Sequence, residues 1–311
     1  MREAVLNLGC SERRGELRLA EPLTRHTSWR VGGPAECFYR PADLADLCTF
    51  LQQLPADEPL FWLGLGSNLL VRDGGIRGTV IATQGALQGL ARTGADTLRV
   101  EAGVPGAKVA RCSTDYDLSG AEFLAGIPGV MGGALAMNAG AWGEETWSLV
   151  AAVETVDRQG TVRCRSPADY EIAYRQVRGP AEEWFVAAQL RLQPGDGAAA
   201  RRRIRRLLER RARTQPMGVP SCGSVFRNPP GDYAARLIET AGLKGTCIGA
   251  ACVSTRHANF IINTGGARAA ELEALIHYVA DTVAQVHGVH LIPEVRVVGE
   301  FQHAQRTAQT G

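Results

Sequence analysis

The sequence predicts an α+β protein of two or three domains, and three observations lead to this expectation. The chain has 311 residues, 45% of them hydrophobic and 21% charged, which is typical of a globular protein with more than one core. Short apolar runs of strand type alternate with helical patterns along the chain. The Pro-Gly-Asp-Gly sequence at residues 194–197 ends the strand-rich part and indicates a domain boundary.

Glycine and proline residues punctuate the chain and divide it into expected elements. Short apolar or β-branched runs predict strands at residues 60–63, 153–156, 184–188 and 258–263. Helical patterns predict helices at residues 201–211, 232–242 and 269–286.

The charge balance indicates small partners. The chain has 34 Lys and Arg against 32 Asp and Glu, a net charge of +2, so any site for an anion must be built locally. The basic helix at residues 201–211 carries Ile204, Leu207 and Leu208 on one face and has no aromatic residue nearby. This pattern favours a solvated helix face over a nucleic-acid site.

Cysteine and histidine spacing argues against a metal. None of the eight cysteines forms a Cys-x-x-Cys pair, and no carboxylate or third ligand stands at a matching distance from His287 and His290. We therefore expect no bound metal and reduced, mostly buried thiols.

Both ends of the chain are expected to lie outside the folded domains. Residues 1–21 form an extension without a basic opening followed by an apolar run, and without a membrane span. The sequence Leu8-Gly9-Cys10 resembles a lipoprotein cleavage site, but the apolar segment before it is short and interrupted by Asn7. We expect a cytoplasmic protein with a disordered tail at residues 302–311.

Two glycine-rich segments are candidates for holding a ligand. Residues 64–71 follow a predicted strand, and their glycines would let main-chain N–H groups converge on a phosphate, aided by Ser67 and Asn68. Residues 126–143 contain six glycines, each of which costs roughly 0.5–1 kcal/mol in a regular element. A large, flat cofactor with phosphate groups would explain both segments, whereas close packing of small residues is the alternative.

A third segment, residues 221–229, combines hydroxyls, a glycine, a cation and an amide. Ser224 can face a cavity, and Arg227 and Asn228 offer donors suited to anionic oxygens. Further along, Glu294 stands among β-branched residues, where a carboxylate is costly unless it is paired or used.

Taken together and in order, these segments resemble the UDP-N-acetylenolpyruvoylglucosamine reductase family, in its shorter type. The resemblance runs from about Thr24 to Phe301 and includes the three segments above. Its other matching segments are residues 26–34, 170–175, 257–261 and 293–295.

The resemblance implies an FAD-binding module of the vanillyl-alcohol oxidase type, made of two α/β subdomains, followed by a smaller α+β substrate-binding domain. The implied limits are residues 22–198, with a subdomain break near 85–95, and residues 199–301. FAD and NADPH are the implied cofactors. The substrates would be NADPH and UDP-N-acetylglucosamine enolpyruvate, with no nucleic acid or membrane as partner.

The same resemblance implies roles for individual residues. Arg175 would bind the substrate carboxylate and stabilise an enolate, Glu294 would assist, and Ser224 would deliver a proton. Substrate diphosphate contacts are implied for Arg213, Gln215, Arg227 and Asn228. FAD contacts are implied for Arg30, Gly64, Leu65, Gly66, Ser67, Asn68, Leu69, Gly126, Ile127, Gly129, Gly132, Gly133, Ala134, Asn138 and Gly140.

Two positions depart from the family pattern, since Val130 and Val177 stand where serine is common. Two alternatives also stay open. One is an oxidase on the same fold that uses oxygen as acceptor, although no motif for covalent flavin attachment is present. The other is a non-catalytic nucleotide-binding protein, which would not need both Ser224 and Glu294.

Overall fold

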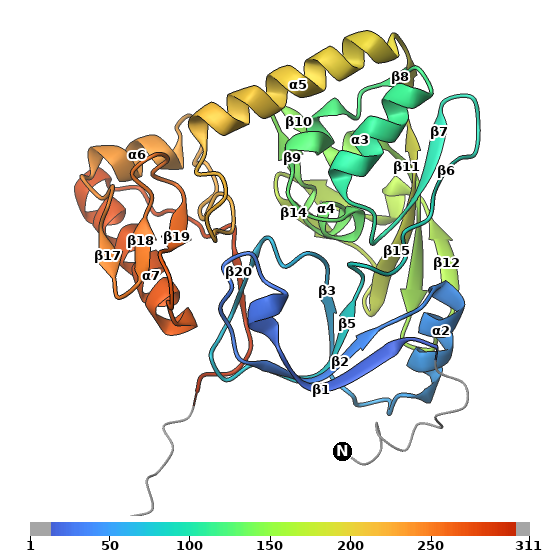
Figure 1. Ribbon diagram of the computed structural model, residues 1–311, viewed down its shortest axis with the longest axis horizontal. Helices are drawn as coiled ribbons and strands as arrows, with labels where there is room; N and C mark the ends of the chain where they lie inside the picture. The colour runs from blue at the N-terminus through green and yellow to red at the C-terminus, as the bar shows by residue number, and fades with distance from the viewer. Residues whose placement is uncertain (1–13, 303–311) are drawn as a thin grey trace, which may run out of the picture. The chain divides into compact units, whose positions relative to one another are not determined.

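The computed structural model describes residues 14–302, and the chain forms two compact units within it (Figure 1). Within the described residues, unit 1 comprises residues 14–18, 38–67 and 80–217. Unit 2 comprises residues 19–37, 68–79 and 218–302. Each unit thus combines segments far apart in the sequence, so the expected linear domain limits do not coincide with these units.

A five-stranded antiparallel sheet organises unit 1. Its strand order is β12-β11-β15-β7-β6, and β11 pairs with both β12 and β15. Burial along β11 does not alternate strictly, since register shifts interrupt its pairing with β15, but the central Val153 and Val156 are fully buried. The strands are β6 (Leu90–Arg92), β7 (Thr97–Glu101), β11 (Val150–Asp157), β12 (Val162–Arg165) and β15 (Glu183–Arg191).

Helices and short hairpins complete unit 1. Its core joins the sheet to three helices and two 3₁₀ turns, with Phe123, Met131, Leu135 and Val153 fully buried. The helical elements are α2 (Leu44–Gln53), α3 (Gly106–Asp115), η2 (Glu122–Gly126), α4 (Met131–Met137), η3 (Thr146–Leu149), η4 (Pro167–Asp169) and α5 (Gly197–Thr214). The short strand pairs are β8 (Leu118–Ser119) with β16 (Gln193–Pro194), β9 (Gly140–Ala141) with β10 (Glu144–Glu145), and β13 (Glu171–Ala173) with β14 (Gln176–Arg178).

A four-stranded sheet of order β1-β2-β5-β3 contains the points where the chain passes from one unit into the other. Strands β1, β2 and β5 each begin in one unit and end in the other, whereas β3 belongs to unit 1. The strands are β1 (Glu16–Pro22), β2 (Pro34–Arg40), β3 (Leu60–Leu63) and β5 (Ile76–Ala82).

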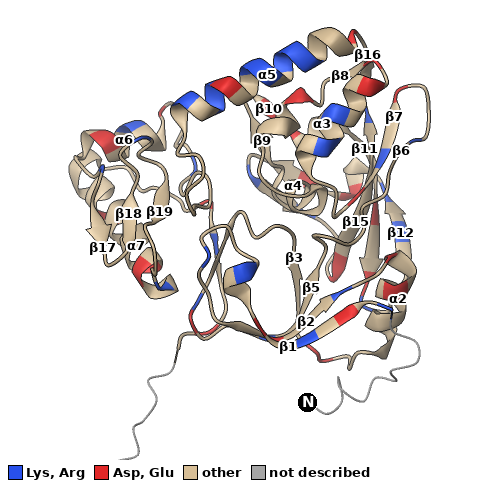
Figure 2. Cartoon of the chain, in the orientation of Figure 1, with Lys and Arg blue, Asp and Glu red and all other residues tan. Residues whose placement is uncertain are grey.

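Helix α5 is the basic helix of the sequence, and Figure 2 shows the basic residues along it. Four of its arginines form ion pairs. Asp196 caps it by accepting from the N–H groups of Ala198 and Ala199 at 2.8 and 3.1 Å. Arg203 donates to the buried carboxylate of Glu122 at 3.4 Å and to Glu144 at 2.9 Å. These ion pairs explain part of the basic face of α5 by contacts within the protein.

Unit 2 has its own core between a small sheet and two helices. The sheet has the order β17-β18-β19 and the core includes Leu237, Val253, Ile261 and Leu275, all buried. A separate parallel pair joins β4 to β20. The elements are η1 (Leu23–Arg25), β4 (Leu69–Val71), α6 (Ala234–Thr240), β17 (Cys247–Ile248), β18 (Ala251–Val253), β19 (Ile261–Asn263), α7 (Ala269–His287) and β20 (Arg296–Val298).

Trp29 fixes the early segment of unit 2 against its last strands. The indole is fully buried and donates from Nε1 to the carbonyl oxygen of Ile261 at 2.7 Å. Asn263 Nδ2 donates in turn to the carbonyl oxygen of Trp29 at 2.9 Å. These two bonds tie residues separated by more than 230 positions, which explains why the chain near residue 30 belongs to the C-terminal unit.

The structure corrects several expectations. Cys247 and Cys252 form a disulfide, because strands β17 and β18 place them opposite each other, so these two thiols are not reduced. The expected extension at residues 1–21 includes strand β1, while residues 1–13, with Cys10, and the tail from residue 303 lie outside the described residues. The strand expected at 258–263 covers only β19. No helix within residues 14–302 is long and apolar enough to span a membrane.

We expect Trp29→Phe to lower the free energy of unfolding of unit 2 by about 2 kcal/mol, because the buried carbonyl of Ile261 loses its donor. Urea unfolding followed by circular dichroism measures the change. Trp62→Phe is the control, since the buried Nε1 of Trp62 has no hydrogen-bond partner among the described residues. An equal loss in both variants would contradict the role of the hydrogen bond.

We expect Arg203→Ala to destabilise unit 1 by about 1–2 kcal/mol, because the buried Glu122 carboxylate loses its cation. Arg202→Ala should change stability by less than about 0.5 kcal/mol, since Arg202 pairs with Asp196 at 3.6 Å on the surface. Thermal unfolding of both variants compares the two sites. Similar losses would indicate that the pair of Arg203 with Glu122 contributes no more to stability than a surface ion pair.

Candidate active site

The two glycine-rich segments lie against each other in unit 1. Ser67 Oγ donates to the carbonyl oxygen of Pro128 at 2.8 Å. A Cβ on Gly64 would lie 2.8 Å from a methyl group of Val130, and one on Gly129 would lie 3.2 Å from Ser67 Oγ. The segments are therefore in van der Waals contact, and side chains at these glycines would push them apart.

Gly132 and Gly133, at the start of helix α4, serve different purposes. The N–H of Met131 donates to the carbonyl oxygen of Val104 at 2.9 Å, and that of Gly132 donates to Ala102 at 2.8 Å. A Cβ on Gly132 would come within 3.1 Å of Ala102, so protein packing explains this glycine. A Cβ on Gly133 would meet no described atom within 4 Å, so packing does not explain that one. Gly133 is exposed, and the surface beside it is open.

Asn138 ends α4 in the left-handed conformation, with φ 45° and ψ 54°. Its side chain is buried and joins three neighbouring segments of unit 1. Next to it, Arg175 donates to the carbonyl oxygens of Asn138 and Gly140 at 3.3 and 2.7 Å. The structure thus brings two predicted cofactor residues together with a predicted catalytic residue.

Ser224 and Glu294 lie on paired segments of unit 2. The Glu294 N–H donates to the carbonyl oxygen of Val225 at 2.7 Å, and Phe226 and Pro293 form an antiparallel bridge. Ser224 is therefore one residue from the main-chain bond that holds Glu294. Arg175 belongs to unit 1, whereas Ser224 and Glu294 belong to unit 2.

Asn259 holds the segment that carries Ser224. Its carbonyl oxygen accepts from Val225 N–H at 2.9 Å, its Oδ1 accepts from Phe226 N–H at 2.9 Å, and its Nδ2 donates to Phe226 carbonyl at 2.8 Å. The Asn259 side chain is buried, and it makes the hydrogen bonds to main-chain groups that a neighbouring strand would otherwise make. Sequence reasoning assigned Asn259 no role, although it stands in one of the segments that carry the family resemblance.

Several predicted ligand residues already have structural partners. Asn68 Nδ2 donates to the Glu294 carbonyl oxygen at 3.0 Å, which supports the Glu294 segment within unit 2. Asn228 Oδ1 accepts from Ala234 N–H at 3.1 Å, at the start of helix α6. Gln215 Oε1 accepts from Arg211 Nε at 3.0 Å, and the exposed Arg213 pairs with Glu209 at 3.7 Å.

The remaining predicted residues are placed as follows. Arg30 is exposed in a turn of unit 2 with φ 57°, and Cys222, next to the Ser224 turn, is fully buried. Burial raises the pKa of the Cys222 thiol, which excludes it as a nucleophile near neutral pH. Arg227 N–H donates to the Ile292 carbonyl oxygen at 2.9 Å. Unit 1 also contains Leu65, Gly66, Gly126, Ile127 and Ala134, whereas Leu69 lies in unit 2.

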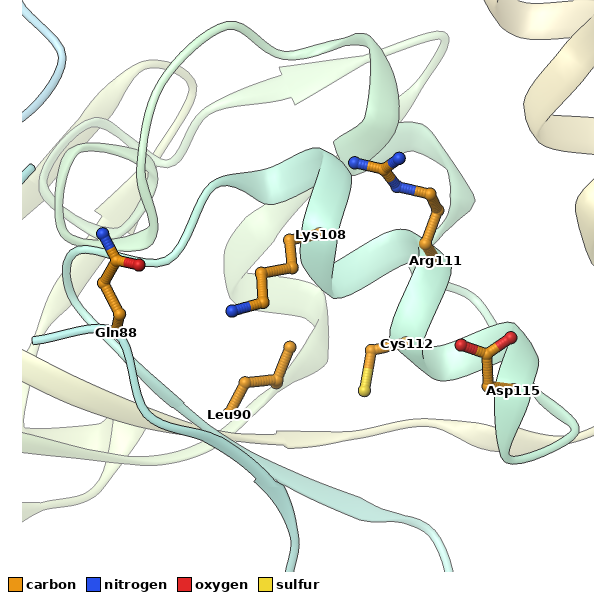
Figure 3. A pocket seen from close by; sticks show the side chains of 6 residues that line it. All are labelled: Gln88, Leu90, Lys108, Arg111, Cys112 and Asp115. Carbon is orange, nitrogen blue, oxygen red and sulfur yellow. The ribbon is translucent and has the colours of Figure 1, made fainter. Parts of the chain in front are cut away.

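A separate pocket of about 310 Å³ lies in unit 1 (Figure 3). It is lined by Gln88, Leu90, Lys108, Arg111, Cys112 and Asp115, and contains none of the predicted site residues. Burial, together with the Asp115 charge, raises the pKa of the Cys112 thiol and disfavours its thiolate. Across residues 14–302, no cluster of three or more His, Cys, Asp or Glu could hold a metal ion.

Comparison with known proteins identifies the two parts of the chain. Residues 35–165 match an FAD binding domain, and residues 215–298 match the C-terminal domain of UDP-N-acetylenolpyruvoylglucosamine reductase. The structure and these matches confirm the predicted α+β fold with an FAD-binding module.

Relatives along the whole chain agree with this assignment. UDP-N-acetylenolpyruvoylglucosamine reductase from Alkalilimnicola ehrlichii is 65% identical, and the match covers 93% of this chain and 96% of that protein. The protein of the same name from Methylococcus capsulatus is 63% identical, with 91% and 93% covered. The crystal structure of UDP-N-acetylenolpyruvylglucosamine reductase from Thermus caldophilus matches with a TM-score of 0.78 and 32% identity, over 91% of this chain and 98% of that one. The chain therefore belongs to the UDP-N-acetylenolpyruvoylglucosamine reductase family and is an FAD-dependent oxidoreductase.

Proposed function

We propose that this enzyme uses NADPH and FAD to reduce the enolpyruvyl group of UDP-N-acetylglucosamine enolpyruvate to UDP-N-acetylmuramate, a precursor of peptidoglycan. The observation that carries the proposal is the pairing, in unit 2, of the segment bearing Ser224 with the segment bearing Glu294. An alcohol and a carboxyl group on adjoining segments suit a proton transfer at one carbon. The names of the most similar relatives support the same reaction.

FAD fits the glycine-rich surface of unit 1. The open space beside Gly133 and the contact between the two glycine segments leave main chain accessible to a large ligand. Bound FAD would accept a hydride from NADPH and supply it to the terminal carbon of the enolpyruvyl double bond. The polar groups of this chain would then complete the reduction.

Arg175 and Glu294 would stabilise the charge that develops on the substrate. After hydride addition, negative charge is shared by the neighbouring carbon and its carboxylate. The Arg175 guanidinium is a planar, permanent cation suited to a carboxylate. The Glu294 side chain would add a hydrogen bond or a proton.

Ser224 would donate its hydroxyl proton to the carbon next to the carboxylate. A serine is a weak acid in water, but a carbanion is far more basic, so alignment rather than a shifted pKa would carry this step. The bonds that Asn259 makes to Val225 and Phe226 would fix the direction of the hydroxyl. The proton that serine loses would be restored from solvent.

Four residues are proposed for the sugar-nucleotide diphosphate: Arg213, Gln215, Arg227 and Asn228. Of these, Arg213 is an exposed cation near the end of α5. Asn228 uses Oδ1 for helix α6, which leaves its Nδ2 as the group suited to an anionic oxygen. We propose a cytoplasmic location, where NADPH and the nucleotide substrate are available, and no nucleic-acid partner.

A spectroscopic experiment tests the function directly. The purified holoenzyme is reduced anaerobically with NADPH, and the flavin absorbance is followed after UDP-N-acetylglucosamine enolpyruvate is added. Rapid return of the oxidised spectrum is expected. Reoxidation by oxygen alone would favour an oxidase instead, and failure of NADPH to bleach the flavin would contradict the proposed reductant.

We expect Ser224→Ala to slow reoxidation of the reduced flavin by substrate by about a hundredfold, because the proton donor is lost. Flavin reduction by NADPH should stay nearly unchanged in the same protein and serves as its internal control. Stopped-flow absorbance measures both half-reactions. Equal slowing of the two would indicate a disordered site and remove the case for a proton-transfer role.

We expect Gly133→Ala to weaken FAD binding while raising the stability of the apoprotein by up to about 1 kcal/mol. The new methyl group meets no described atom, and alanine favours the helix over glycine. Flavin fluorescence titration and thermal unfolding of the apoprotein measure the two effects. Unchanged FAD affinity would place the cofactor away from Gly133.

A further inference from the structure

Arg175 lies in a turn that glycine or asparagine would fill at lower cost. Strands β13 and β14 pair Ala173 with Gln176, so Tyr174 and Arg175 form a two-residue hairpin loop. Arg175 has φ 55°, in the left-handed region. For an ordinary L-residue this conformation costs roughly 1–2 kcal/mol. Such strain persists only where the surrounding structure holds it, and it concentrates at functional sites.

The main chain around Asn138 holds the Arg175 side chain. The guanidinium donates from Nη1 to the Asn138 carbonyl at 3.3 Å and from Nη2 to the Gly140 carbonyl at 2.7 Å. It also lies over the Tyr174 ring, with 4.9 Å between Cζ and the ring centroid. The side chain is 15% exposed. The direction of the guanidinium therefore depends on where the Asn138–Gly140 carbonyls point.

Asn138 is in turn fixed by its side chain. Nδ2 donates to Glu145 Oε2 at 2.8 Å and to the Ala173 carbonyl oxygen at 3.2 Å, and Oδ1 accepts from Trp147 N–H at 3.1 Å. The bond to Ala173 reaches the hairpin that carries Arg175. Both Asn138 amide hydrogens are thus used, one on the hairpin and one on Glu145.

Glu145 contacts this arrangement at two points. One carboxylate oxygen accepts from Asn138, and the other, Oε1, lies 4.0 Å from Arg175 Nη1. The neighbouring Glu144 faces a different group, Arg203, at 2.9 Å. Glu145 is therefore the carboxylate of β10 that acts on both Arg175 and the residue that orients it.

We propose that Glu145 is a positioning residue for Arg175. Glu145 fixes the Asn138 side chain and thereby the carbonyl oxygens that direct the Arg175 guanidinium. It also adds a negative charge nearby, which keeps the cation in this region. The inference rests on the proposed function, in which Arg175 binds the substrate carboxylate. Glu145 itself does not touch the substrate.

The experiment compares half-reactions in variants of the holoenzyme. Glu145→Ala should slow flavin reoxidation by UDP-N-acetylglucosamine enolpyruvate about 10- to 100-fold, since small misplacements of a catalytic group have effects of this size. Reduction by NADPH should stay within about twofold. Glu145→Gln, which can still accept from Asn138, should lose less than about fivefold. Glu144→Gln is the matched control and should leave both half-reactions unchanged.

A double-mutant cycle tests whether Glu145 acts through Arg175. In an Arg175→Ala background, Glu145→Ala should slow reoxidation no further than about twofold. Losses of reoxidation rate that multiply independently in the double variant would overturn the proposal. Equal slowing of both half-reactions, or no effect of Glu145→Ala, would also overturn it. If Arg175→Ala alone leaves flavin reoxidation intact, the role proposed for Arg175 in the reaction is wrong. If Arg175→Ala slows it and Glu145→Ala does not, only the positioning role fails.

Discussion

The close approach of two main-chain segments, at residues 102–105 and 129–133, is the constraint on which unit 1 depends. Met131 and Gly132 donate to the carbonyls of Val104 and Ala102, and Pro105 bridges Val130. These bonds need a residue without Cβ at position 132, because Ala102 lies in contact range. They fix the first turn of α4, the helix ends at Asn138, and Asn138 orients Arg175. A half-buried glycine thus influences, through one short helix, where a cation lies more than 40 residues later.

In unit 2 the side chain of Asn259 holds an irregular main-chain segment in place. The segment from Ser224 to Phe226 is irregular, and a buried irregular segment must still satisfy its N–H and C=O groups. Asn259 supplies an acceptor and a donor to Phe226, and its carbonyl serves Val225. The Val225 carbonyl is then bonded to Glu294. The Asn259 amide therefore satisfies main-chain groups of the Ser224 segment as a neighbouring strand would, although this segment lies outside a regular sheet.

The sequence predicted much of this, and the exceptions have physical causes. Runs with clear periodicity, such as those of β3, β15, α5 and α7, were predictable because local burial alone sets their pattern. The family resemblance pointed to the glycine segments, to Arg175 and to the Ser224 segment. Asn259 and Glu145 received no role because their importance lies in bonds to distant main-chain atoms, which leave no periodic signal. The Cys247–Cys252 disulfide was missed because it depends on the register of a short hairpin.

Two neighbouring residues of unit 1, Asn138 and Arg175, adopt left-handed backbone conformations with φ 45° and 55°. Glycine would relieve both turns. The backbone cost is roughly 1–2 kcal/mol at Arg175 and smaller at Asn138, because asparagine tolerates this conformation, and side-chain contacts must offset it. For Asn138 the compensation is visible, because its amide group makes three hydrogen bonds inside unit 1. For Arg175 the compensation comes from the guanidinium, which donates hydrogen bonds to two main-chain carbonyls and lies over the Tyr174 ring. Hydrogen bonds from a charged donor contribute roughly 1.5–3 kcal/mol each, so these contacts offset the cost of the turn. The contacts that hold the strained turn therefore also fix the direction of the cation.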